Sequence, residues 1–197
     1  MTTTFKNFSK HASLFLIMSA TLGASACKKN SPADEVTPDL EVKKVVDLDG
    51  TAGTVYVNLA TGEAVAETST NWDIAFNSMR IILGNGAQAQ IVEGVFDNII
   101  LAPDAGYSAS EIAGSGSVYT YTGQVPTGAA HAVLITPGRV IVVKTHDNNY
   151  AKIELVSYYQ GNPDTTTPQF ADLTTRPKSR YYSFDYVLQP DGSKNLK

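Results

Sequence analysis

Few side chains in this sequence can bind a transition metal. The 197 residues include three histidines, three methionines and one cysteine. Imidazole, thioether and thiolate groups are the softer protein ligands for iron, copper and zinc. A single cysteine excludes a disulfide framework, an all-cysteine zinc site and a cysteine-ligated iron–sulfur cluster within one chain. Any metal chemistry must therefore rely mainly on the histidines and methionines.

The charge and the missing catalytic motifs narrow the function classes. A formal net charge of −4 argues against a nucleic-acid-binding protein, which needs a basic surface to neutralise phosphates. The sequence has no P-loop, no Gly-x-Ser-x-Gly elbow and no His-Glu-x-x-His pair. A hydrolase would require Asp147, one histidine and a serine or threonine to converge in one pocket. We therefore expect a binding protein and not an enzyme.

The first 26 residues have the composition of a secretory signal peptide. Lys6 and Lys10 precede an apolar run over residues 14–18, and small residues fill most positions from 20 to 26. A basic region, a short apolar core and a small-residue cleavage site are typical of an export signal. We therefore predict that residues 1–26 are a signal peptide. The residue that follows, Cys27, indicates that it is a lipoprotein signal peptide.

The only cysteine lies where a lipoprotein would carry its lipid. The segment Ala24-Ser25-Ala26-Cys27 resembles a bacterial lipobox, which implies cleavage before Cys27 and acylation of its sulfur. The alternative is an ordinary secretory signal followed by an unmodified Cys27. Residues 28–40 contain two prolines and no apolar period. We predict that residues 27–40 are the lipidated cysteine and a flexible tether that reaches at most about 45 Å.

Cleavage would change the supply of metal ligands. The mature chain would lose one histidine and two methionines, and its formal net charge would become −6. The remaining imidazole and thioether side chains are His131, His146 and Met79. One mature chain therefore cannot supply two methionines to the same metal.

From residue 41 onward, short β-branched and aromatic runs alternate with glycine- and asparagine-rich turns, which predicts strands. The expected strands are 42–46, 54–58, 72–76, 79–83, 88–92, 139–145, 150–160 and 180–188. Residues 139–145 are almost continuous valine and isoleucine, typical of a strand buried on both faces. The dipeptide Asn85-Gly86 favours a hairpin between 79–83 and 88–92.

Helix should be scarce. Residues 108–112 have the spacing of a capping box, but the glycines at 114 and 116 would end any helix within about one turn. Residues 161–179 contain three prolines, which predicts a long loop. We predict one all-β domain over residues 41–197, an antiparallel β sandwich or partly closed barrel with little helix.

Three segments stand out, namely 72–77 (WDIAFN), 150–159 (YAKIELVSYY) and 181–192 (YYSFDYVLQPDG). Their sequences and order resemble the HmuY family of haem-binding lipoproteins from Bacteroidetes, over roughly residues 42–195. The resemblance implies an all-β fold, attachment to the outer membrane through a lipid, and delivery of haem to a TonB-dependent receptor. The expected location is therefore the outer membrane, on either its periplasmic or its surface face.

The resemblance does not assign iron ligands, because the matching segments are strands. Haem iron accepts histidine nitrogen, methionine sulfur, tyrosine oxygen or cysteine sulfur. The candidate axial ligands are His131, His146 and Met79, with a tyrosine or a single axial ligand as alternatives. His131 lies among small residues that would let a flat ring approach, and His146 follows strand 139–145 in a turn. Met79 follows strand 72–76, and filling the core is the commoner use of a methionine at such a place.

Ligation of one haem iron by both histidines is possible only if the fold lets the two imidazole rings face each other. If 132–136 and 139–145 formed a hairpin closed by Pro137-Gly138, His131 and His146 would be diagonal neighbours on one sheet face. Their Cα atoms would then lie about 7–8 Å apart, and their rings would not face each other through a porphyrin. Ligation by both therefore requires His131 to lie on a separate loop.

The predicted function is a lipid-anchored protein that captures haem or a porphyrin and passes it to an outer-membrane receptor. Its mechanism would be an apolar clamp with axial ligation, without catalysis. The alternative is a lipoprotein of the same fold that has lost haem ligation and binds another ligand or a partner protein, because fold alone does not determine function.

Overall fold

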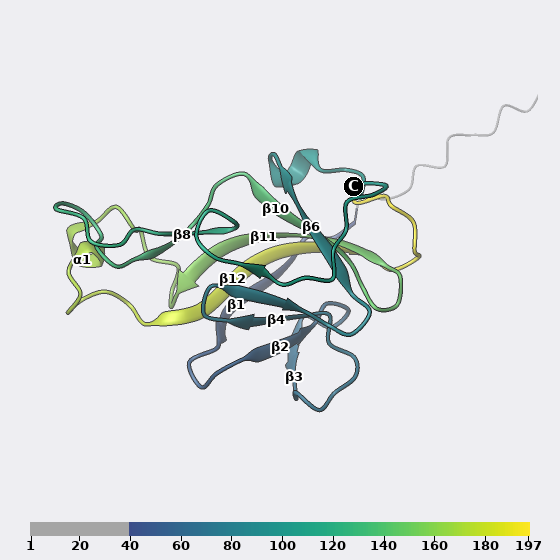
Figure 1. Cartoon of the computed structure of the whole chain (residues 1–197), viewed down its shortest axis with the longest axis horizontal. Coiled ribbons are helices and arrows are strands. Elements are labelled where there is room, and N and C mark those ends of the chain that lie inside the picture. Colours follow the sequence, from purple (N-terminus) through teal and green to yellow (C-terminus); the bar gives the residue numbers. More distant parts are fainter. Residues whose placement is uncertain (1–39) are drawn as a thin grey trace, which may run out of the picture. The chain divides into compact units, whose positions relative to one another are not determined.

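The computed structural model describes residues 40–197, and the predicted signal peptide and Cys27 lie outside the described residues. Two five-stranded antiparallel sheets and one two-stranded sheet form the fold (Figure 1). The first sheet has the order β1-β12-β11-β10-β6, the second has the order β3-β2-β4-β5-β7, and β8 pairs with β9. No helix of residues 40–197 is long and apolar enough to cross a membrane.

The elements of the first sheet are β1 (Lys43–Asp49), β6 (Gln88–Glu93), β10 (Arg139–Lys144), β11 (Tyr150–Tyr159) and β12 (Ser179–Gln189). The second sheet contains β2 (Val55–Asn58), β3 (Glu63–Val65), β4 (Ile74–Asn77), β5 (Arg80–Leu83) and β7 (Ile112–Ala113). The two-stranded sheet is β8 (Tyr119–Tyr121) and β9 (Val133–Ile135), and the helical turns are η1 (Phe96–Asn98) and α1 (Pro168–Ala171). The all-β prediction is confirmed, and the strands form open sheets and not a closed barrel.

The valine-rich strand is central and buried, as its sequence predicts. β10 pairs with β11 on one side and with β6 on the other. Val140, Ile141, Val142 and Val143 are all buried, because each face of β10 packs against a different apolar cluster. A strand with two covered faces has no position for a polar side chain, which explains the continuous apolar run.

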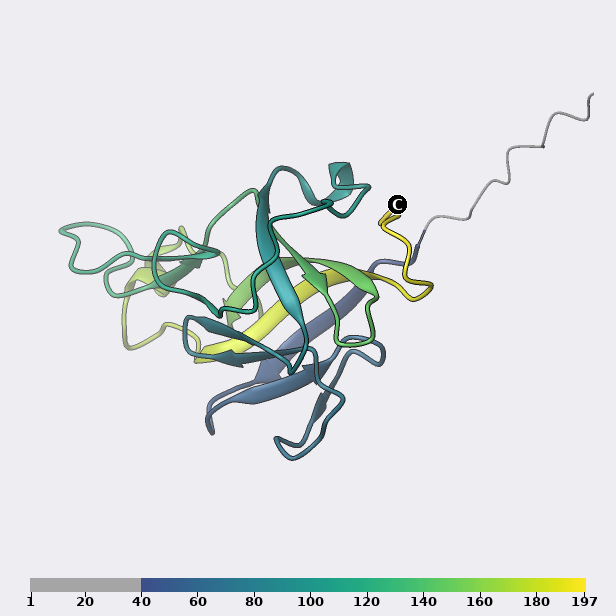
Figure 2. The ribbon, with the colours of Figure 1, turned by 45° about the vertical axis from the view of Figure 1, so that its right-hand side comes forward.

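The main core combines inward-facing side chains of both five-stranded sheets. Phe76 of β4 stacks on Tyr182 of β12 with ring centroids 4.7 Å apart. The ring of Phe184 lies 5.4 Å from the ring of Phe76. A second cluster lies on the opposite face of the first sheet, where η1 and the C-terminal segment cover it (Figure 2). Phe96 of η1 and Leu196 are buried there.

Neither the hairpin expected at Asn85-Gly86 nor the one considered at Pro137-Gly138 forms. β5 pairs with β4 and β6 pairs with β10, so Gly84-Asn85-Gly86 connects the two sheets and closes no hairpin between 79–83 and 88–92. β9 pairs with β8, and so the hairpin considered between 132–136 and 139–145 is also absent. Long-range burial of each strand outweighs the local preference of Asn-Gly for a tight turn.

The helical expectations also need correction. The capping-box segment 108–112 forms no helix, and its last residue begins the short strand β7. The region 161–179, expected as a loop, contains the single turn α1. Thr167 caps α1, because its side chain accepts a hydrogen bond from the Phe170 backbone N–H.

At Gly84, where the chain crosses between the two sheets, any residue with a Cβ atom should destabilise the fold. A Cβ at Gly84 would lie 2.2 Å from the Trp72 carbonyl oxygen, a backbone atom that cannot move freely. Gly84→Ala should therefore lower the free energy of unfolding by about 2–3 kcal/mol. Gly114→Ala is the control, because Gly114 has open space and only a positive φ, so its cost should be about 1 kcal/mol. Equal urea midpoints for the two variants would contradict the close approach.

Candidate functional site

A cavity of about 560 Å³ opens between the β8–β9 hairpin, the end of β11 and the loop that follows β11. One wall is the apolar strand β9, and the other includes Tyr158 and Tyr159. Residues 162–165 form the rim. Small-molecule sites in proteins have volumes of about 300–1,000 Å³, so this cavity is large enough for a drug-sized or cofactor-sized ligand.

A β-bulge directs the two tyrosines of the wall. The pairing of β11 with β12 is irregular on either side of Ser157. The Ser157 Oγ accepts from the Tyr159 N–H at 3.0 Å and donates to the Tyr159 carbonyl at 2.8 Å. The alternation of faces is broken there, so that the consecutive residues Tyr158 and Tyr159 are both buried in the main core cluster and both line the cavity.

The β8–β9 hairpin is held in place at two points. The Tyr159 hydroxyl accepts a hydrogen bond of 3.0 Å from the Val133 N–H. The Arg176 guanidinium donates to the carbonyls of Ala130 and His131 at 2.9 and 3.3 Å, and to the carbonyl of Phe170 at 2.8 Å. Arg176 therefore links the hairpin to α1, and together these contacts fix the hairpin against the end of β11 and α1.

His131 lies at the end of this hairpin and is exposed. Its φ is +52°, a conformation that few residues adopt outside tight loops. Its Nδ1 lies 2.7 Å from the Tyr121 hydroxyl, and its Nε2 lies 2.9 Å from Oε1 of Gln124. Both ring nitrogens are therefore engaged, and the imidazole is not among the residues that line the cavity.

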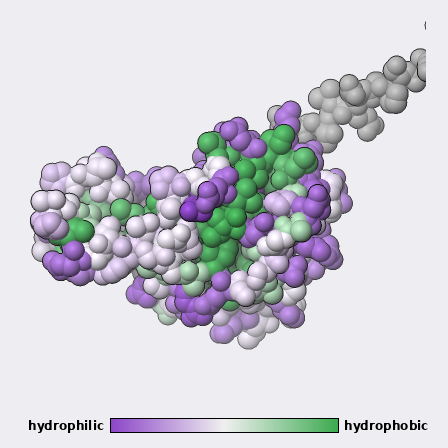
Figure 3. Space-filling model, turned by 45° about the horizontal axis from the view of Figure 1, so that its top comes forward, coloured by the Kyte–Doolittle hydropathy of each residue, from purple (hydrophilic) through white to green (hydrophobic). Residues whose placement is uncertain are grey.

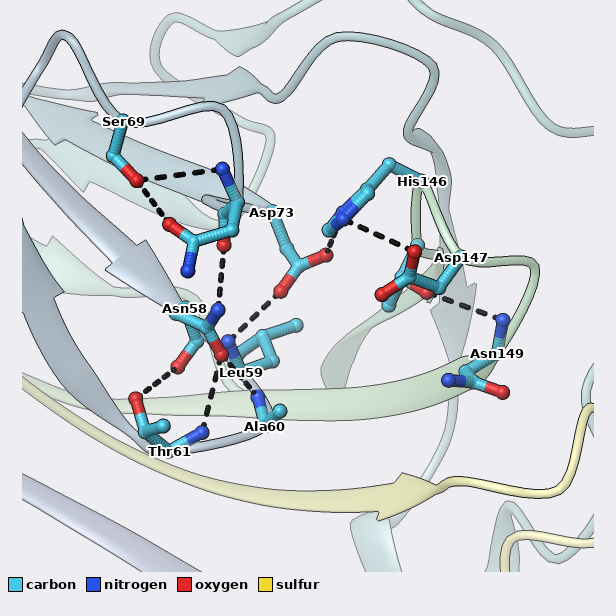
Figure 4. A network of polar contacts seen from close by, with 11 residues as sticks. Asn58, Leu59, Ala60, Thr61, Ser69, Asp73, His146, Asp147 and Asn149 are labelled. Atoms are coloured by element: carbon cyan, nitrogen blue, oxygen red, sulfur yellow. Dashed lines mark hydrogen bonds and ion pairs between the residues drawn. The ribbon is translucent and has the colours of Figure 1, made fainter.

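His146 belongs to a different environment, a polar network at the turn between β10 and β11 (Figure 4). Its Nδ1 lies 3.0 Å from Oδ1 of Asp73, and its Nε2 lies 3.2 Å from Oδ1 of Asp147. The other Asp73 oxygen accepts from the Leu59 N–H at 2.8 Å. The adjacent hollow holds only about 20 Å³, far too little for a ligand. This network joins the two five-stranded sheets and occupies both nitrogens of His146.

Met79 lies in the turn between β4 and β5, where it is half-buried and packs against the main core. This position matches the core-filling use of methionine that the sequence left open. Among residues 40–197, no group of three or more histidine, cysteine, aspartate or glutamate side chains could hold a metal ion.

The structure does not bring the two histidines together. His131 is close to the end of β11, because Val133 is bonded to Tyr159. His146 precedes the beginning of β11, and ten residues of strand span roughly 30 Å. One iron therefore cannot be ligated by both rings in this arrangement.

Sequence reasoning missed the cavity-lining role of Tyr158 and Tyr159, which it placed only within the expected strand 150–160. The available signal was the Tyr-Tyr pair itself, because two large side chains in succession interrupt the alternation of β11 before Gly161. Burial raises the pKa of Tyr158, so its phenol stays neutral near neutral pH.

The Asp73 network predicts a graded loss of stability. Asp73→Ala should lower the free energy of unfolding by about 3 kcal/mol, because it leaves the buried Leu59 N–H and the His146 ring without their acceptor. His146→Ala should cost about 1 kcal/mol, since Asp73 keeps its bond to Leu59. The exposed partner Asp147 is the control, and Asp147→Ala should change stability by less than about 0.5 kcal/mol. Urea unfolding measures all three, and similar values for Asp73→Ala and Asp147→Ala would refute the network.

Comparison with known proteins gives one family and several similar folds. The family model described as HmuY protein matches residues 51–186. The apo HmuY analogue TFO of Tannerella forsythia is 18% identical, with a TM-score of 0.50, over 80% of this chain and 100% of that chain. Apo PinO from Porphyromonas gingivitis is 17% identical, with a TM-score of 0.51, over 77% of this chain and 98% of that chain. None of the curated proteins compared with the chain matches it. Because the family model covers most of the chain, this protein belongs to the HmuY family.

Proposed function

We propose that this chain is a lipid-anchored protein that binds haem or a related porphyrin in the cavity beside the β8–β9 hairpin. The observation that carries the proposal is the cavity itself, whose apolar wall of Val133, Leu134 and Ile135 faces two tyrosine side chains. A flat, largely apolar macrocycle gains most of its binding free energy from such burial. Membership of the HmuY family adds the expectation of haem as the ligand.

The residues of the cavity constrain how iron could be held. Among the described residues that line it, the only side chains of the types that usually hold haem iron are the phenols of Tyr158 and Tyr159. The Tyr159 hydroxyl already accepts a bond from Val133. Of the candidates His131, His146 and Met79, only His131 belongs to a hairpin that forms a wall of the cavity, and it would have to leave Tyr121 and Gln124 to reach the iron. Haem here would therefore depend on burial of the ring and on His131 as a single axial ligand.

A second candidate is a member of the same family that binds a porphyrin or another apolar ligand without ligating iron. The specific observation in its favour is that no histidine, methionine or cysteine is among the described residues that line the cavity. The two candidates share the cavity and differ only in the role of His131.

Both described histidines are engaged with other side chains. Both ring nitrogens of His146 face carboxylates, and those of His131 face a phenol and an amide. Neither ring is therefore placed to activate a serine or threonine hydroxyl, which the hydrolase alternative requires.

Cys27 would carry the lipid that holds the domain at the outer membrane, and a TonB-dependent receptor would accept the haem.

An optical titration with haem tests the first candidate. A shifted Soret band should appear, and His131→Ala should weaken binding by about tenfold, the loss of roughly 1.4 kcal/mol. His146→Ala and Met79→Leu are matched controls that should leave the band and the affinity unchanged. Dependence of the band on His146 or Met79 would place the iron elsewhere and reject this site.

Iron-free protoporphyrin separates burial from ligation. Ile135→Trp should fill the cavity and weaken binding of both haem and protoporphyrin by at least about tenfold. Val95→Trp, an equally large change at an exposed position away from the cavity, should leave both affinities intact. Equal affinity for the two porphyrins, unaffected by His131→Ala, would favour the second candidate. Tight binding by the Ile135→Trp variant would exclude the cavity for either.

A further inference from the structure

A band of exposed apolar side chains crosses the outer face of the first sheet, beside the point where the described chain begins (Figure 3). Val42 and Ile100, 42% and 47% exposed, line one hollow together, and Val95 and Leu101, 60% and 64% exposed, belong to the same segment of chain as Ile100. That hollow, of about 260 Å³, continues the band, with walls that include Leu40 and Leu196. We call this surface, from Leu40 and Val42 to Val95, Ile100 and Leu101, the entry face. Contiguous apolar surface of this kind marks contact with another apolar phase or molecule.

Backbone hydrogen bonds fix the beginning of the described chain to the entry face. The Leu40 N–H donates to the Lys197 carbonyl at 2.7 Å, and the Leu196 N–H donates to the Ile100 carbonyl at 2.9 Å. The Ala102 N–H donates to the Lys194 carbonyl at 2.8 Å. The C-terminal segment is thus bonded to Leu40 on one side and to residues 100–102 on the other. The direction of the chain at Leu40 is therefore coupled to the orientation of Ile100 and Leu101.

A buried lysine holds the loop that carries the other apolar residues. Lys152 is 3% exposed, and its Nζ donates to the Phe96 carbonyl at 2.9 Å and lies 4.4 Å from the centre of the Phe96 ring. Burial lowers the pKa of Lys152. The side chain of Phe96 is buried beneath η1, while the neighbouring Val95 stays exposed. The apolar exposure is therefore built into a packed loop and is not the result of a frayed end.

The length of the preceding segment indicates what covers the entry face. If Cys27 carries a lipid, residues 28–39 keep the bilayer within about 45 Å of Leu40. Of the surfaces of the domain, the entry face contains the attachment point and is apolar. Apolar side chains in a partly folded or folded surface segment are stabilised by insertion at the boundary between lipid headgroups and acyl chains.

We propose that the entry face rests on the lipid bilayer to which Cys27 anchors the chain, with Val95, Ile100 and Leu101 inserted at the headgroup boundary. The inference rests on the proposed lipid anchor. Lys152, beneath the entry face, is near the start of β11, whereas Tyr158 and Tyr159 of the cavity are at its end. Figure 1 shows β8 and α1 on the left of the domain, away from the C-terminus. The cavity then lies away from the entry face.

Depth-dependent fluorescence quenching tests this orientation. In a Trp72→Phe background, Leu101→Trp probes the entry face, and Val46→Trp is the matched control. Val46 is 70% exposed and lies on β1 only six residues from Leu40, so tethering alone brings both probes near the lipid. The acylated protein, purified from membranes, is reconstituted in vesicles of phosphatidylethanolamine and phosphatidylglycerol that contain brominated lipid.

The Leu101→Trp variant should show blue-shifted emission and at least about twofold stronger quenching than the Val46→Trp variant, as expected for insertion by about 5–10 Å. Equal quenching of the two variants overturns the proposal. A blue shift of the Leu101→Trp variant without vesicles, with a dimer mass in sedimentation, also overturns it and assigns the entry face to a second copy.

The lipid anchor is tested separately by the mass of the purified protein. A mass without acyl chains refutes the anchor at Cys27. In that case the free Cys27 thiol is coupled to a maleimide lipid, and the same pair of variants decides whether the entry face meets the bilayer. Haem titration of both variants in solution should match the parent protein, so that a failure of the porphyrin proposal is seen independently.

Discussion

The burial of the aromatic face of β12 against β4 is the contact on which the rest of the structure depends. Phe76 packs between Tyr182 and Phe184, and Tyr186 continues the row 5.9 Å from Phe184. Such ring pairs contribute about 0.5–1.5 kcal/mol each beyond the burial of their area. Because β12 pairs with both β1 and β11, this contact also fixes the position of the end of β11. The cavity wall formed by Tyr158 and Tyr159 is a consequence of that placement.

A polar contact reinforces the same junction. Asp73, almost completely buried, ties the beginning of β4 to the turn after β10 through His146 and to the chain after β2 through Leu59. Apolar packing between sheets tolerates small slides, whereas hydrogen bonds to a carboxylate demand fixed distances and directions. The pair therefore specifies one arrangement of the two sheets. It also explains why His146, a turn residue that the sequence offers as an iron ligand, has its ring nitrogens paired with carboxylates.

The strands were predictable because their signal is local. The continuous valine run of β10 follows directly from the burial of both faces of that strand, and the aromatic residues at every second position of β12 follow from the face that it turns toward the main core. Strand pairing was less accessible, since Gly84-Asn85-Gly86 carries a strong hairpin signal although its role is a crossover. The reason is the close approach of Gly84 to Trp72, a tertiary constraint that no local pattern contains.

The candidate site was predictable only in part. The sequence supplied the short list of possible iron ligands, and the small residues before His131 matched its place in an open loop. It could not show that Asp73 meets His146, because 73 residues separate them. Nor could it reveal the cavity, since its tyrosine wall depends on a bulge at Ser157 that arises from pairing with β12.

Arg176 fixes the β8–β9 hairpin by hydrogen bonds to backbone carbonyls. Its acceptors here are backbone carbonyls, which no side-chain substitution removes. An ion pair with a carboxylate would be lost when one acidic residue is replaced, whereas these acceptors belong to the main chain of two separate elements. The hairpin that forms one wall of the cavity is thus held to α1 through one side chain, and the position of that wall depends on Arg176.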